Sequence, residues 1–216
     1  MIYDKMIFYI IKAMKNDGAT MQSIASITFF THGTTTDNEK GIATGWLPGQ
    51  LSEKGRRECL ELGEMLSGQR FQAVFCSNLG RAIDSARLMF YGSREIIEDM
   101  GLRECNYGDM NGKSAAQVDM MMKSCIEKPF PNGESYRDVE NRMKVFLSGL
   151  LHEHAGEAVA IVGHRATQLA LEVVVRGRTW QQAMDEDWRL MKPRQWRPGW
   201  HYVMTGQKLG LVEPVA

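Results

Sequence analysis

The sequence predicts an α/β fold in which a mostly parallel sheet is covered by helices on both faces. Short apolar runs bounded by turn residues alternate along the chain with stretches of helical spacing, and this alternation is typical of such sheets. The 216 residues are 44% hydrophobic and 24% charged, as in an ordinary globular protein. A chain of this length can bury a substantial core without disulfides or metals. The pattern leaves the order of the strands open.

The first half of the chain contains two predicted strand–helix units. Residues 27–30 are apolar and aromatic and are followed by the turn-rich segment 31–37, as expected for a buried strand. Ser52 is placed to cap a helix that runs toward Gly68, because a serine oxygen accepts hydrogen bonds from the first free N–H groups of a helix. The next elements expected are a strand over 73–76 and a helix over about 79–90.

The second half repeats the alternation around a longer irregular stretch. Ser135 opens a long helix, and the apolar residues 158–162 form a strand that leads through Gly163 into another helix. The remaining expectations are a brief strand at 96–97, an irregular segment over 101–113, a short helix over 115–122, a loop over 129–133 and an edge strand over 200–204.

The N-terminal residues 1–22 are expected to form a flexible extension before a single domain over 23–216. The apolar stretch 6–13 is too short to span a bilayer and is interrupted by Lys12. Asp4 spoils the positively charged start of a secretory signal. We therefore expect a cytoplasmic protein without a membrane anchor.

Charge and cysteine usage exclude several classes of partner. The 26 basic and 26 acidic residues cancel, so no overall field favours nucleic acid or an anionic membrane, and a small anionic ligand must be held by local charges. The four cysteines lie far apart and form neither a zinc motif nor a secreted disulfide framework. We expect reduced thiols, no metal and no cofactor. The cysteines are Cys59, Cys76, Cys105 and Cys125.

Two histidines lie where a ligand is expected in such a sheet. His32 and His164 each follow the carboxyl end of a predicted buried strand, and this edge is where ligand crevices form in open α/β sheets. His164 also begins a helix, where free backbone N–H groups favour an anion. Placement alone is weak evidence, because isolated histidines are often structural.

Several short segments match one known pattern. Residues 31–38, which read Thr-His-Gly-Thr-Thr-Thr-Asp-Asn, resemble the Arg-His-Gly motif of the histidine phosphatase superfamily, branch 1, which includes phosphoglycerate mutase-like proteins. A single block is a weak signal, but all of them in the family's order over roughly 27–170 are a strong one. The resemblance implies a three-layer α/β/α sandwich. The further blocks are 43–46, 51–55, 77–82, 102–104, 107–108, 131–135 and 162–164.

The resemblance implies a phosphoryl-transfer site. His32 would attack phosphorus, and Arg81 would hold the phosphate oxygens through its guanidinium fork. His164 would donate further hydrogen bonds to the same oxygens. Glu104 would give a proton to the leaving oxygen and then take one from water. Asn38, Thr44 and Gly45 match positions that line the phosphate or substrate site.

Each of these residues also has an ordinary explanation when taken singly. Arg81 is equally suited to an ion pair with Asp84 or Asp99, and Glu104 to a solvated loop. Asn38 is suited to capping a turn. Only their joint occurrence in register with the motif blocks favours the functional interpretation.

Thr31 departs from the family pattern, because the residue before the nucleophile is normally arginine. Losing one such charge-assisted contact typically costs about 2–4 kcal/mol of transition-state stabilisation. Arg165 is expected to reach the phosphate as a substitute, with Arg103 as the other candidate. Thr31 also keeps open a weakened or non-catalytic phosphate-binding relative.

The expected function is a metal-independent phosphoric monoester hydrolase of the histidine acid phosphatase type, acting on a small-molecule phosphate monoester. Mutases of this kind insert a long basic segment between the acid and the second histidine. Here 164 − 104 = 60 positions separate them, which favours hydrolysis over a phosphoglycerate-type mutase. The physiological substrate and the oligomeric state stay open.

The basic and aromatic C-terminal stretch is expected to pack beside the mouth of the site. Asp185, Glu186 and Asp187 dilute its charge, which argues against single-stranded nucleic acid as a partner. The stretch carries Trp180, Trp188, Trp196 and Trp200 together with Arg189, Lys192, Arg194 and Arg197.

Overall fold

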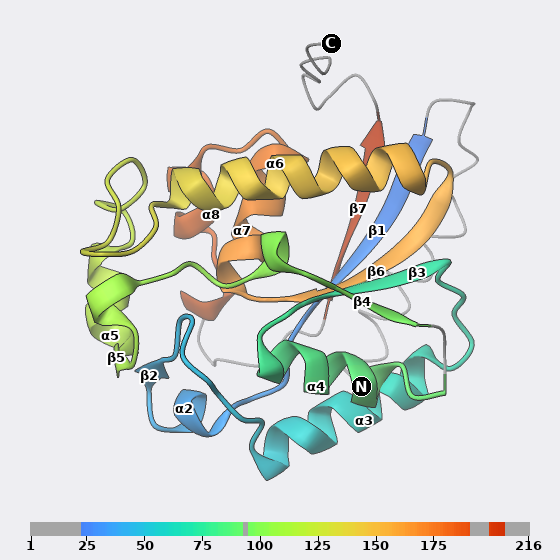
Figure 1. Ribbon diagram of the computed structural model, residues 1–216, viewed down its shortest axis with the longest axis horizontal. Helices are drawn as coiled ribbons and strands as arrows, with labels where there is room; N and C mark the ends of the chain where they lie inside the picture. The colour runs from blue at the N-terminus through green and yellow to red at the C-terminus, as the bar shows by residue number, and fades with distance from the viewer. Residues whose placement is uncertain (1–22, 93–94, 191–198, 206–216) are drawn as a thin grey trace.

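A five-stranded sheet forms the centre of the computed structural model, which describes residues 23–92, 95–190 and 199–205 (Figure 1). The strand order is β4-β3-β6-β1-β7, and every neighbouring pair is parallel except β1 and β7. The mostly parallel sheet of the prediction is thus confirmed, and the expected edge strand is β7. The strands are β1 (Ser23–Thr31), β3 (Ala73–Ser77), β4 (Ile96–Asp99), β6 (Glu157–Gly163) and β7 (Gly199–Thr205).

Helices cover both faces of this sheet and give the three layers that were expected (Figure 1). One face carries α3 (Glu53–Leu66) and α4 (Gly80–Met89). The other carries α6 (Tyr136–Glu153), α7 (Arg165–Val174) and α8 (Trp180–Asp185). The smaller elements are α2 (Thr36–Glu39), α5 (Ala115–Met121), the pair β2 (Ile42–Ala43) and β5 (Lys113–Ser114), and the 3-10 turns η1 (Met100–Leu102), η2 (Gly108–Met110) and η3 (Trp188–Leu190).

The two-residue period of the central strands divides the core between the layers. In β1, Phe29 packs into the cluster beneath α6 and α7, while Phe30 packs into the cluster beneath α3 and α4. In β6, Ile161 and Val162 divide in the same way. Both strands are buried on both faces, which explains why they appear in the sequence as continuous apolar runs.

Helix caps set where the main helices begin. The Ser52 hydroxyl accepts from the Gly55 N–H at 3.2 Å, which starts α3 at the predicted place. Ser135 and Asp138 form a reciprocal capping box at the start of α6, so the cap predicted there is also confirmed.

Some expectations fall outside the described residues. The flexible extension over 1–22 is one, and the extent of a single domain over 23–216 therefore stays a prediction. Among the described residues, no helix combines the length and the apolar character needed to cross a membrane.

Candidate functional site

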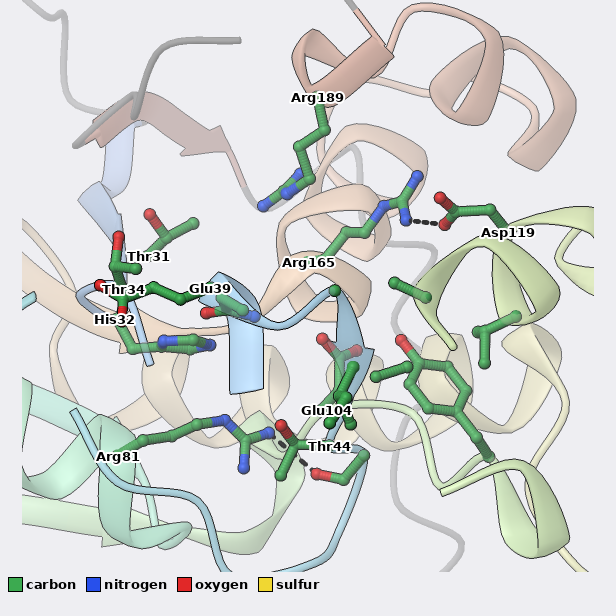
Figure 2. A pocket seen from close by; sticks show the side chains of 18 of the residues that line it. Thr31, His32, Thr34, Glu39, Thr44, Arg81, Glu104, Asp119, Arg165 and Arg189 are labelled. Carbon is green, nitrogen blue, oxygen red and sulfur yellow. Dashed lines mark hydrogen bonds and ion pairs between the residues drawn. The ribbon is translucent and has the colours of Figure 1, made fainter. Parts of the chain in front are cut away.

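A pocket of about 390 Å³ opens at the carboxyl edge of the sheet (Figure 2). Three neighbouring parallel strands end at this edge: His32 follows β1, His164 follows β6, and Arg81 follows β3 in the first turn of α4. His32 and Arg81 line the pocket, whereas His164 is fully buried beside His32 and is not among the lining residues of the described chain. Loops and helices from both halves of the chain complete the wall. The lining residues are Thr31, His32, Thr34, Asn38, Glu39, Gly41, Ile42, Ala43, Thr44, Gly45, Lys54, Arg81, Glu104, Tyr107, Ala115, Val118, Asp119, Arg165, Trp188 and Arg189.

His32 presents a neutral ring with a defined tautomer. Its Nδ1 lies 2.8 Å from the Gly33 carbonyl oxygen, and because a carbonyl only accepts, Nδ1 carries the proton. Burial, followed by the charge of Arg81, lowers the pKa of His32 from 6.5 to about 3. The lone pair is therefore on Nε2, the ring nitrogen that can act as a nucleophile.

His164 lies directly beside His32 and is fully buried. The two ring centroids are 5.0 Å apart, and neither ring nitrogen of His164 has a hydrogen-bond partner in the described part of the chain. Burial and the charge of Arg81 hold its pKa well below the ordinary value. The backbone fixes its place, because its N–H donates to the Thr167 hydroxyl at 2.9 Å in the first turn of α7.

Arg81 is 3% exposed and extends along the pocket beneath His32 (Figure 2). Its Nη2 donates to the Gly45 carbonyl at 2.9 Å, while its Nη1 is buried without a partner among the residues described. Gly45 has φ of +55°, and a Cβ there would lie 1.7 Å from Asn111 Oδ1. A glycine is thus required where the chain turns its carbonyl toward Arg81.

Glu104 lies opposite His32 and is 7% exposed, so it is not the solvated carboxylate of the ordinary explanation. Its Oε1 accepts from the backbone N–H groups of Cys105, at 2.8 Å, and Ala166, at 3.1 Å. Ala166 belongs to the first turn of α7, so the carboxylate is joined to the helix that His164 begins. These bonds hold one oxygen and fix the direction of the side chain.

Two predicted binding residues line the pocket but also have structural duties. The side chain of Asn38 accepts from the Thr35 N–H at 3.1 Å and completes the capping box of α2. The Thr44 hydroxyl donates to Asp37 Oδ2 at 2.8 Å. Asn38 therefore has the capping role expected of it when it is considered alone, and it also forms part of the pocket wall.

The two arginines considered as substitutes at Thr31 differ in their placement. Arg165 lines the pocket, but its Nε donates to Asp187 at 2.6 Å and its Nη1 donates to Asp119. Arg103 is not among the lining residues of the described chain; it donates to Asn78 and stacks over the ring of Trp46 at 4.6 Å.

Arg189 also lines the pocket, together with Trp188, and sequence reasoning did not assign it to the site. The available signal was the basic and aromatic stretch expected at the mouth. That expectation is confirmed for Trp188 and Arg189, which line the pocket. It does not hold for Trp180 and Trp200, which are buried in the core and do not line the pocket. Lys192, Arg194, Trp196 and Arg197 lie outside the described residues.

No group of three or more metal-binding side chains occurs in the described ranges, and the four cysteines are buried thiols. Burial raises the pKa of Cys59 to about 11 and that of Cys76 to about 12, so neither is a reactive thiolate at neutral pH. The side chains that face the pocket carry imidazole, guanidinium and carboxylate groups. Such a set can bind an oxyanion, attack it with a neutral imidazole and supply a proton from the facing carboxyl group.

The chain is similar to known proteins in both sequence and structure. Over 163 residues it is 31% identical to the 2,3-bisphosphoglycerate-dependent phosphoglycerate mutase 2 of Gloeobacter violaceus, and the match covers 68% of this chain and 74% of the mutase. The structure of YhfR from Bacillus stearothermophilus is 27% identical with a TM-score of 0.66, covering 74% of this chain and 83% of that one.

A mycobacterial glucosyl-3-phosphoglycerate phosphatase, solved with VO3, shares the fold with a TM-score of 0.67 at 24% identity, covering 74% of this chain and 86% of that one. The family model of the histidine phosphatase superfamily (branch 1) matches residues 27–189, well over half of the chain. The chain therefore belongs to branch 1 of the histidine phosphatase superfamily.

Proposed function

We propose that this protein is a phosphomonoesterase that works through a covalent phosphohistidine on His32. The observation that carries the proposal is the set of buried donors around that ring. The ring of His164 and Nη1 of Arg81 have no partner among the described residues. A buried polar group left unpaired costs about 1–3 kcal/mol, so these groups are explained by a ligand that pairs them. A phosphoryl group, with three acceptor oxygens, is such a ligand.

In the first step, Nε2 of His32 attacks phosphorus while the bond from phosphorus to the ester oxygen breaks. Arg81 and His164 hold the non-bridging oxygens, over which charge spreads in the transition state. Glu104 in its protonated form gives its proton to the leaving oxygen, so the product leaves as an alcohol. Dividing the displacement at a covalent intermediate replaces one difficult step with two easier ones.

In the second step, water attacks the phosphorus of the phosphohistidine and the bond between phosphorus and nitrogen breaks. Glu104, now ionised, accepts the proton of the water. Inorganic phosphate leaves, and His32 returns to its neutral form with the Nδ1 proton still held by the Gly33 carbonyl. No metal ion is required by these steps, and we propose a metal-independent enzyme with a cytoplasmic location.

The alternative function is a phosphoglycerate-type mutase, which the names of the curated relatives favour. Two observations favour hydrolysis. Only 60 positions separate Glu104 from His164, and the solved structures of similar fold include a glucosyl-3-phosphoglycerate phosphatase and an α-ribazole phosphatase. A pocket weakened by Thr31, which binds phosphate without turnover, is the non-catalytic alternative.

The test is release of inorganic phosphate from a panel of small phosphate monoesters, with a chelator present. We expect turnover by the wild-type protein and none by His32→Ala. The matched control is His152→Ala, because His152 is exposed at the end of α6 and should be dispensable. Interconversion of phosphoglycerates without phosphate release would identify a mutase, and phosphate binding without turnover of any substrate would identify the non-catalytic alternative.

A further inference from the structure

The residue before the nucleophile brings no charge to the pocket. Thr31 ends β1, is 6% exposed and lines the pocket next to His32. A phosphate monoester carries between 1.5 and 2 negative charges at neutral pH, by the usual second ionisation near pH 6. Arg81 supplies a single positive charge, and it approaches His32 from one side only (Figure 2).

Arg189 approaches the same space from the opposite side. Its side chain extends from η3 toward His32 and Thr31, across the pocket from Arg81 (Figure 2). It is 12% exposed and lines the pocket. Its charge contributes, after burial and Arg81, to lowering the pKa of His32.

The structure around Arg189 holds its guanidinium in place. Asp187, whose side chain is fully buried, accepts from Nη1 of Arg189 at 2.9 Å and from its backbone N–H at 3.0 Å. The guanidinium carbon also lies 4.8 Å above the ring of Trp188. Trp188 in turn packs against Trp200, and Trp200 against Phe29 in the core. A guanidinium fixed in this way loses little entropy when it binds an anion.

Arg165 is the weaker candidate for the same task. Its guanidinium is placed between two carboxylates, with Asp187 at Nε and Asp119 at Nη1. These two charges raise the pKa of Arg165 against the effect of burial and offset its positive charge. Arg165 thus serves to join α7 to α5 and to the segment that carries Arg189.

We propose that Arg189 is the second phosphate-binding guanidinium of this enzyme, opposite Arg81, and that Asp187 is its positioning residue. The inference rests on the proposed function, because it assigns Arg189 to the phosphoryl group that His32 attacks. Two guanidinium groups then contact the bound ester from opposite sides, and Arg189 shares one carboxylate, Asp187, with Arg165. Thr31, at the end of β1, supplies no positive charge, and Arg189 in η3 supplies one instead.

The test compares Arg189→Met with wild type, using p-nitrophenyl phosphate for turnover and inorganic phosphate for binding. Methionine keeps the length of the side chain without its charge. We expect kcat/KM to fall by about 10²–10³, the usual loss when one charge-stabilising donor is removed. The affinity for inorganic phosphate should fall at least about tenfold, as expected for losing a charged hydrogen bond.

The control is Arg137→Met, because Arg137 pairs with Glu127 and Glu140 on α6 and does not line the pocket beside His32. It should match wild type in both assays. A rescue variant adds Thr31→Arg to Arg189→Met, which returns a guanidinium from the other side. Recovery of at least about tenfold in phosphate affinity would support the proposal. If Arg189 had only a structural role, an arginine at position 31 would not replace it.

The positioning role of Asp187 is tested by Asp187→Asn alone and combined with Arg189→Met. We expect a loss smaller than that of Arg189→Met, and losses that are not additive when combined, since Asp187 acts in part through Arg189. Additive losses would remove Asp187 from the proposal.

Phosphate binding separates this inference from the proposed function. Unchanged phosphate affinity in Arg189→Met would overturn the inference, whether or not the wild-type protein hydrolyses an ester. Wild-type protein that binds phosphate through Arg189 but turns nothing over would contradict the proposed function alone.

Discussion

The neutral ring of His32 follows from two neighbours rather than from its own ordinary pKa. The Gly33 carbonyl keeps the proton on Nδ1, and burial beside Arg81 prevents a second proton from binding until the pH reaches about 3. A histidine with an ordinary pKa of 6.5 would lose its nucleophilic lone pair in mild acid. The proposed nucleophile therefore keeps its lone pair well below neutral pH.

This state of His32 predicts an unusual acid limb in the pH profile of kcat/KM, which reports the free enzyme and the free substrate. Because His32 is neutral above about pH 3, the limb should follow the second ionisation of the substrate phosphate, near pH 6. The measurement uses two aryl phosphates with different second pKa values, and the limb should move with the substrate. A limb near 6.5 that is the same for both substrates would show that His32 titrates normally.

The sequence predicts some of these residues better than others. His32 and His164 stand out on physical grounds, because each follows an apolar run that forms a central strand. Arg81 and Glu104 were assigned only through the family resemblance, since a single charge in a helix or loop has an ordinary explanation. Arg189 is 157 positions after His32 (189 − 32), and its placement depends on how η3 packs, which no local pattern encodes.

At the scale of elements, helix α3 supports the loop that carries His32. Gly55, in its first turn, lies so close to the loop that a Cβ would be 1.9 Å from the Thr34 carbonyl oxygen. The Ser52 N–H also donates to that carbonyl at 2.9 Å. The absence of a side chain at Gly55 thus lets the helix and the loop touch through their backbones.

Gly55→Ala should therefore displace the loop after β1 and reduce both stability and turnover. Backbone atoms cannot move aside as a flexible side chain can, and forced contacts of this kind cost about 1–3 kcal/mol. Urea denaturation and phosphate release measure the two effects.

The control for Gly55→Ala is Gly149→Ala, in the exposed face of α6, where an added Cβ meets nothing within 4 Å. This change should stabilise the protein by about 0.5–1 kcal/mol through helix propensity and leave turnover unchanged. Equal behaviour of the two variants would contradict the role given to Gly55.

The larger elements were predicted because burial and capping act locally. The strands β1, β3 and β6, and the helices α3, α4, α6 and α7, occur where the apolar runs and capping residues placed them. The elements missed were α2, the two-residue strands β2 and β5, and α8, which are too short to show a period. Tertiary contacts hold these short elements in place. One example is the backbone N–H of Ala115, which donates to the Gly41 carbonyl next to the β2–β5 pair.

At the scale of the whole molecule, the parallel sheet brings residues from distant parts of the chain to one edge. The neighbouring strands β3, β6 and β1 end at one edge, so Arg81, His164 and His32 meet there. Strand order could not be read from the sequence, because the alternation of strands and helices is the same for several topologies. The meeting of these residues is therefore a property of the fold, anticipated only through the resemblance.

Burying two neutral histidines at this edge makes stability depend on pH. Burial lowers the pKa of His32 to about 3 and that of His164 well below 6.5. As the pH falls below 6.5, the unfolded chain binds protons at these positions and the folded protein does not. The free energy of unfolding should then fall by up to about 1.4 kcal/mol per pH unit for each histidine.

Denaturation by urea at pH 7.5 and pH 5, in buffers without phosphate, measures this dependence. His164→Asn should flatten it, because the buried imidazole that resists protonation has been removed. A dependence of the same slope in wild type and in this variant would show that His164 does not couple folding to pH.

The central claim is that His32 carries the phosphoryl group during turnover. The most direct measurement is a rapid acid-free quench with an isotopically labelled phosphate ester, followed by peptide mapping of the trapped protein. We predict an acid-labile, base-stable label on the peptide that contains His32, absent from His32→Ala and hydrolysed at the rate of turnover. Normal turnover by His32→Ala, or a label on another residue, would contradict the account.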